Sequence, residues 1–292
     1  MYNVQGSGCI MRNIRECLLL LVIHIRKETA KPKLYCIALI SILYLSALLK
    51  PVVAFSRDVG INIAPFAAVF VFSDFNSTFA SMMMLLGMAC LCSDYPVLDG
   101  QHVFCLLRAR KTNWICSQVL MLLAIAVVYV LLWTIGSLLP CIANTKWDMQ
   151  WGKIWNTLAL TNAGEAYGLE LDVGSSLITN YTPMQALLMS MALKVSVCFF
   201  IALCVFAGNM FLSAGLGTLI GFALALEDIF AFNAGIGYWF TWFSPATMSR
   251  LVALDQTRTF LFPDFAQAMS IINGLSAILI ALIIIRGRKK AV

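Results

Sequence analysis

The sequence predicts an all-α, polytopic membrane protein. The chain has 292 residues, of which 61% are hydrophobic and 12% are charged, and its mean hydropathy is +0.87. A soluble domain of this length would carry about 25% charged residues, because its surface must face water. At roughly 20 residues per spanning helix, the length allows about six spans with their loops. No room is left for a large soluble domain.

Residues 1–33 predict a cytosolic or interfacial amphipathic helix. Between Ile10 and Thr29, apolar residues recur at helical spacing opposite a charged face, the apolar set being Ile14, Leu18, Leu21, Val22 and Ile25. This pattern is typical of a helix that lies in the membrane interface. A signal peptide is the competing interpretation. We reject it because the apolar stretch Cys17–Ile23 is followed by His24, Arg26 and Lys27, with no small-residue cleavage site.

Residues 34–286 predict a six-helix transmembrane domain. The expected spans are about 34–55, 72–92, 115–139, 186–207, 211–226 and 270–285. A turn at Gly208 and Asn209 would join the fourth span to a short fifth one, which Gly215, Gly217 and Gly221 interrupt. A cytosolic loop, 93–114, would connect the second and third spans, and a basic tail, 287–292, would follow the last.

The positive charges predict the orientation. Thirteen Lys and Arg residues fall in the N-terminal segment, the loop after the second span and the C-terminus, against five on the other side, which are Arg57, Lys146, Lys153, Arg250 and Arg258. Cytosolic loops carry the excess of Lys and Arg, so both termini should be cytosolic and the number of spans even. The segment Ile229–Phe243 is apolar but only 15 residues long. We expect it to be re-entrant or interfacial.

Few residues could carry chemistry. The two histidines lack partners at a catalytic spacing, no phosphate-binding loop is present, and the Cys90–Cys92 pair has no second pair at metal-ligand spacing. We therefore expect neither catalysis nor a metal in this chain. Ionisable residues within spans are costly and are functional candidates by default, here Asp74, Lys194 and Glu227. An intramembrane ion pair among them is possible, but snorkelling or a purely structural pair is the favoured explanation.

The loop from Ser93 to Trp114 is the most informative segment. Asp99 is a plausible N-cap for a short helix over Gly100–Lys111, whose basic residues Arg108 and Lys111 would favour its C-terminal end. Such a helix would present one apolar face, formed by Val103, Phe104 and Leu107. An amphipathic stretch on lipid headgroups would explain the basic end, but not the two acids Asp94 and Asp99.

These elements together resemble the permease subunit of an ABC-2 type transporter. The stretch DYPVLDGQHVFCLLRARKTNW is similar to the acidic-Pro-acidic then Arg/Lys-Trp pattern of small permeases from Gram-positive bacteria, and Ser244-Pro245 before the last span fits as well. The resemblance implies a multi-pass protein of the bacterial plasma membrane that exports cargo. It also implies that the loop contacts a separate ATPase through Asp94, Asp99, Gly100, Val103, Phe104, Leu107 and Arg108.

The resemblance further implies the partners. Two copies of the ATPase would bind ATP and Mg, no cofactor would lie in this chain, and a second permease, identical or paralogous, would complete the pathway within membrane lipid. The charge excess is concentrated at a few places, so nucleic acid is not expected as a partner. The sparse charges of the spans favour a hydrophobic or amphiphilic cargo, such as a peptide, lipid or drug. An ion-coupled secondary transporter and a non-transporting membrane scaffold or immunity subunit are the alternative functions.

Overall fold

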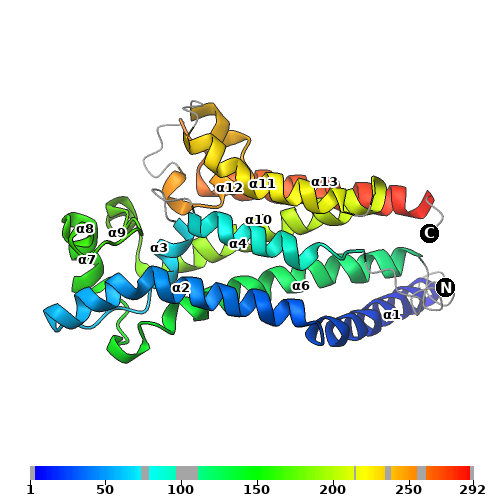
Figure 1. Ribbon diagram of the computed structural model, residues 1–292. Helices are drawn as coiled ribbons and strands as arrows, with labels where there is room; N and C mark the ends of the chain where they lie inside the picture. Colours follow the sequence, from blue (N-terminus) through cyan, green and yellow to red (C-terminus); the bar gives the residue numbers. More distant parts are fainter. Residues whose placement is uncertain are drawn as a thin grey trace.

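A computed structural model describes residues 4–73, 79–96, 111–213, 215–233, 238–254 and 261–289. These residues form helices joined by short connections, and the described part contains no strand beyond one bridge between Ile63 and Thr145. The helices run along a common axis (Figure 1). Both termini lie at one end of this bundle, and three short helices lie at the other.

Four helices are long and apolar enough to cross a bilayer, which makes the chain a multi-pass membrane protein. They are α2 (Pro32–Val59), α6 (Lys111–Leu138), α10 (Pro183–Phe211) and α13 (Phe265–Lys289). With 28 residues, α2 extends over about 42 Å, more than the roughly 30 Å of a hydrocarbon core. These helices contain the predicted spans 34–55, 186–207 and 270–285, and all but the last residue of 115–139.

The core of the bundle lies around α10. This helix contacts α6, α13 and two shorter helices, α4 (Phe79–Cys92) and α11 (Leu216–Asn233), and it has the largest buried share of the four candidate spans. Outward-facing positions of α2 and α13 are instead apolar and exposed, as in Ile40 and Ile278. Such exposure is expected where lipid is the solvent.

The predicted second span, 72–92, differs most from the structure. Its place is taken by two helices, α3 (Ala67–Ser73) and α4 (Phe79–Cys92). All seven residues of α3 are buried, and α4 with 14 residues extends over only about 21 Å, which is less than a membrane thickness. The predicted start at Phe72 therefore falls near the end of α3. Asp74 lies outside the described residues.

The predicted turn at Gly208 and Asn209 was wrong. Helix α10 continues through both residues to Phe211, and α11 (Leu216–Asn233) begins after a short connection. Gly217 and Gly221 do not interrupt α11. A Cβ atom on Gly217 would overlap the carbonyl oxygen of Val205, and one on Gly221 would lie 2.6 Å from the Val205 side chain. The glycines therefore let the two helix backbones approach closely, as small residues do in membranes.

The end of the bundle opposite the termini is a small helical cap. It comprises η1 (Ile142–Asn144), α7 (Gly152–Leu160), α8 (Ala163–Ala166) and α9 (Ser175–Asn180). Before α13 come three further short elements, η2 (Tyr238–Trp242), α12 (Pro245–Met248) and η3 (Leu251–Ala253). The segment predicted as re-entrant or interfacial, 229–243, thus begins as the last five residues of α11 and ends in η2.

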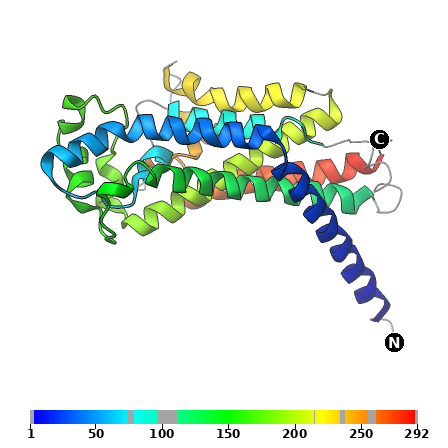
Figure 2. The same cartoon turned by 60° about the horizontal axis from the view of Figure 1, so that its bottom comes forward.

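The N-terminal helix α1 (Val4–Thr29) is formed as expected and lies at an angle to the bundle (Figure 2). It packs against α6, where Asn113 Nδ2 donates to Glu16 Oε2 at 3.0 Å and the Gln118 side chain lies 3.2 Å from His24 Nε2. The helix also exposes large apolar side chains, which are Leu18, Leu19, Val22, Ile23 and Ile25. An exposed apolar face of this kind suits a membrane interface.

Candidate functional site

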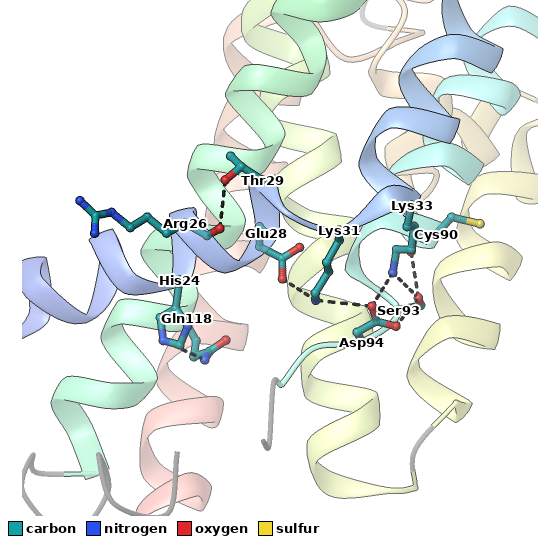
Figure 3. A network of polar contacts seen from close by, with 10 residues as sticks. All are labelled: His24, Arg26, Glu28, Thr29, Lys31, Lys33, Cys90, Ser93, Asp94 and Gln118. Atoms are coloured by element: carbon teal, nitrogen blue, oxygen red, sulfur yellow. Dashed lines mark hydrogen bonds and ion pairs between the residues drawn. The ribbon is translucent and has the colours of Figure 1, made fainter. Parts of the chain in front are cut away.

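A polar cluster, which we call the junction, joins the start of α2 to the segment that follows α4 (Figure 3). Lys33 Nζ lies 2.9 Å from Asp94 Oδ2 and donates to Ser93 Oγ at 2.8 Å. Lys31 Nζ lies 2.6 Å from Glu28 Oε1 and 3.6 Å from Asp94 Oδ2. The junction thus consists of Glu28, Lys31, Lys33, Ser93 and Asp94, and it lies at the end of the bundle that carries the termini.

The local sequence explains why these charges meet. Helix α1 ends at Thr29, and Lys31 precedes Pro32, whose missing N–H is tolerated at the first position of a helix. The chain changes direction there, so that Glu28 at the end of one helix and Lys33 at the start of the next face the same segment. Ser93 Oγ donates to Cys90 O at 2.9 Å and so fixes that segment to the end of α4.

The charges of the junction favour ionisation. Partial burial opposes the charge on Asp94, but the hydrogen bond from Lys33 and the positive charges of Lys33 and Lys31 outweigh it and lower the pKa of the carboxyl group. Burial likewise disfavours the charged form of Lys31, yet its hydrogen bond and ion pair with Glu28 and the charge of Asp94 raise its pKa. Burial, followed by the negative charge of Glu28, raises the pKa of Tyr95, whose ring lies 5.9 Å from Lys31 Nζ.

Asn209 ties the same segment to two more helices. Its Nδ2 donates to the carbonyl oxygens of Ser93 at 2.9 Å and Tyr95 at 2.8 Å, while its Oδ1 accepts from the backbone N–H groups of Gly215 and Gly217, both at 3.0 Å. These four bonds use both donors and both lone pairs of the amide. The segment after α4 is therefore fixed to the end of α10 and the start of α11.

Only one predicted ATPase-contact residue, Asp94, lies within the described part of the chain. The others, Asp99, Gly100, Val103, Phe104, Leu107 and Arg108, lie outside it. The described segment leads directly into them, since it ends at Pro96. The segment 93–96 contacts α2 through Lys33, α4 through Ser93, and α10 and α11 through Asn209. The sequence offered one signal for Asn209, a polar residue near the end of a long apolar helix, which we had attributed to a turn.

A second polar cluster is buried inside the bundle. Lys194 Nζ donates to Ser81 Oγ at 2.6 Å and to Ser249 Oγ at 2.8 Å. Glu227 Oε1 accepts from Ser244 Oγ at 3.0 Å and from the Ala246 N–H at 3.2 Å. The structure therefore brings Lys194 and Glu227 to the same short segment, 244–250. Asp74, the third predicted member of this set, lies outside the described residues.

The same segment contains an ion pair that we did not predict. Arg250 Nη2 lies 2.6 Å from Asp228 Oδ1, which also accepts from Thr247 Oγ1 at 2.8 Å, and both charged side chains are 1% exposed. We had counted Arg250 as a loop residue that reports topology. Its burial corrects that assignment, because a charge in this environment persists only when it is paired.

Neither cluster resembles a metal centre. Among the described residues, no three His, Cys, Asp or Glu side chains gather closely enough to hold a metal ion. Comparisons of the chain with protein-family models, curated proteins and solved structures gave no match. The arrangement of the two clusters is consequently the basis for assigning a function.

Proposed function

We propose that this chain is the membrane-spanning subunit of an ATP-driven exporter of the ABC-2 type. ATP is bound and hydrolysed by a separate ATPase, two copies of which dock on the cytosolic side, and a second permease completes the pathway. The cargo is hydrophobic or amphiphilic, and the membrane is the bacterial plasma membrane. The proposal keeps the predicted six spans: α3 with α4, and α11, supply the two crossings beyond the four long helices.

The observation that carries this proposal is the junction together with Asn209. A permease without its own ATPase needs a segment that receives movement from a partner and passes it to the spans. Here the segment 93–96 is fixed to α2 by Lys33, to α4 by Ser93, and to α10 and α11 by Asn209. In the sequence it lies three residues before the predicted coupling helix, Gly100–Lys111. Packed helices and hydrogen-bond networks are the means by which such movement is carried.

The positions of the termini support the orientation. Both lie at the end of the bundle that carries the junction, as an even number of crossings requires (Figure 1). The basic residues Lys31 and Lys33 lie at that same end. Under the positive-inside rule this end faces the cytosol, where an ATPase would be found.

The test is purification of the chain from its host in mild detergent, with partners identified by mass spectrometry. We expect an ATPase with a phosphate-binding loop in the wild-type complex and its loss from the double variant Phe104→Asp/Leu107→Asp, because charges would then occupy the apolar docking face. The matched control is Ile142→Asp/Leu160→Asp, which also replaces two apolar side chains by aspartate, at exposed residues of the opposite end. Retention of the ATPase by the first variant would refute the assigned docking face. Absence of any ATPase from the wild type would refute the assignment to ATP-driven transporters.

An ion-coupled secondary transporter is the second candidate. The buried Lys194, Asp228 and Arg250, together with the half-buried Glu227, favour it, since ionisable residues within a membrane commonly mark ion pathways. Transport in sealed vesicles discriminates between the two. Dependence on an imposed proton or sodium gradient without ATP would support this candidate, whereas dependence on internal ATP alone would support the exporter.

A further inference from the structure

A large cavity opens at the end of the bundle opposite the termini. Its volume is about 840 Å³, and it lies between three chain segments, 60–64, 146–156 and 178–183. Cavities of about 300–1,000 Å³ are typical of small-molecule sites. The cavity is distinct from the junction and from the buried cluster, and nothing in the proposed coupling to an ATPase uses it.

The walls of this cavity are held in place by hydrogen bonds. Trp155 Nε1 donates to Ala64 O at 2.9 Å, and Trp151 Nε1 donates to Tyr181 O at 3.0 Å. The backbone of Ile63 bonds to Asn144 O at 2.8 Å and to the Lys146 N–H at 3.1 Å. All three segments are therefore tied to one another. The cavity is preformed, so a ligand would bind without the cost of ordering its site.

Positive charge predominates on the walls. Lys146 and Lys153 line the cavity, and neither makes an ion pair within the described part of the chain. Asp148 is the single acidic residue among the described lining residues, and its Oδ1 accepts from the backbone N–H of Gln150 at 3.3 Å. Two exposed ammonium groups on one concave surface, with no ion pair to another described residue, attract anions.

Two helix N-termini add to this charge. Helices α7 and α10 both begin at the cavity, since Gly152 and Pro183 line it. Neither helix has an acidic residue in its first turn or a side-chain hydrogen bond at its N-cap. The N-terminal end of a helix carries a partial positive charge and free N–H groups that bind oxyanions. The two helix N-termini and the two lysines therefore all favour a ligand that carries an oxyanion.

The cavity also has an apolar side. Ile61, Met149, Trp151 and Ile178 line it together with the polar groups. Trp147, next to the lining residue Lys146, is 79% exposed, and a tryptophan of this kind favours the headgroup level of a membrane. A free oxyanion would fill only a small part of the volume and would leave the apolar side without a partner.

We propose that this cavity binds an anionic amphiphile, with the phosphate or carboxylate group held by Lys146 and Lys153 and the apolar part resting on Ile61, Met149 and Ile178. The proposal does not rest on the exporter assignment, because it is argued only from the residues that line the cavity. It names a class of ligand: a molecule with an oxyanion headgroup and an acyl or similarly apolar chain.

The test is calorimetric titration of the purified full chain in a nonionic detergent. Three probes are compared: dihexanoyl phosphatidylglycerol, dihexanoyl phosphatidylcholine with the same chains and a zwitterionic headgroup, and inorganic phosphate. We expect the anionic lipid to bind at least about tenfold more tightly than either of the others, a factor that corresponds to about 1.4 kcal/mol.

Two variants locate the site. Lys146→Gln/Lys153→Gln should remove the preference for the anionic lipid, and both lysines are exposed, so the change leaves the packing intact. Thr161→Glu/Ala166→Glu is the matched control, since it alters the net charge by the same amount at exposed residues outside the cavity. An unchanged preference in the lysine variant, or equal affinity for both lipids, would overturn the site. Inorganic phosphate that binds as tightly as the anionic lipid would overturn the assignment to an amphiphile.

Discussion

Replacing Arg250 by methionine tests whether burial determines how much the ion pair with Asp228 contributes to the free energy of unfolding. The substitution keeps a side chain of similar length but removes the charge that faces Asp228 at 2.6 Å. With both side chains only 1% exposed, water cannot replace the lost partner of the carboxylate. Breaking a buried pair by removing one partner costs about 3–5 kcal/mol, because an uncompensated charge is left behind.

The matched control is Lys33→Met at the junction. Lys33 and Asp94 form a similar bond, 2.9 Å long, but their side chains are 28% and 50% exposed. Removal of an exposed pair costs at most about 1 kcal/mol, because water solvates the remaining carboxylate. The free energy of unfolding of each variant can be measured in bicelles by steric trapping. A third variant, Arg250→Met/Asp228→Leu, should recover most of the loss, since it removes both charges.

Two results would refute this reasoning. If Arg250→Met lowers the free energy of unfolding by no more than Lys33→Met does, burial does not determine the contribution of the ion pair to stability. If the double variant is as unstable as Arg250→Met, the loss of stability comes from altered packing and not from the unpaired negative charge of Asp228.

The remaining predictions concern the junction and the contact between α10 and α11. Because the folded-state pKa of Asp94 is lowered, its contribution to stability is complete above the ordinary carboxyl pKa of about 3.9 and is lost as the pH falls through the lower folded value. In acid titrations followed by circular dichroism, Asp94→Asn should therefore show a shallower loss of stability than the wild type, and an identical pH profile would contradict this. Gly217→Ala should lower the stability by about 1–3 kcal/mol, because the added carbon overlaps the Val205 carbonyl oxygen. Gly274→Ala is its control, because a Cβ there meets nothing within 4 Å, and thermal unfolding of both in detergent should separate them, whereas equal melting temperatures would contradict the close approach of the helices.

The long spans could be predicted from the sequence because each is a long run of predominantly apolar residues. Helices α2, α6, α10 and α13 match their expected positions, and their ends follow local rules such as Pro183 at a first turn and the left-handed Gly60 after α2. The second span could not be placed, because we counted back from Cys92 along one straight helix. The structure has two helices there, and the apolar residues from Ala67 to Ser73 gave no sign of the division.

The clusters were predictable only in part. The acidic Asp94 was singled out, and so were Lys194 and Glu227, since charges within apolar runs are conspicuous. Their contacts were not predictable, because each joins residues far apart in the chain: Lys33 with Asp94, Lys194 with Ser81, and Arg250 with Asp228. Glycines were misinterpreted for the same reason. In the sequence, a glycine that interrupts a helix looks the same as one that allows a neighbouring helix to approach closely. Only the contact between Gly217 and Val205 shows that Gly217 has the second role.

Hydrogen bonds attach helix α11 to other segments at two separate points. Near its first turn it is held by Asn209, and in its second half the adjacent carboxylates of Glu227 and Asp228 hold the segment 244–250. Gly217 and Glu227, the two attachment points, are separated by ten residues of one continuous hydrogen-bonded helix, or about 15 Å, and such a helix resists compression far more than a loop does. Helix α11 therefore forms a stiff connection between the segment that follows α4 and the segment 244–250.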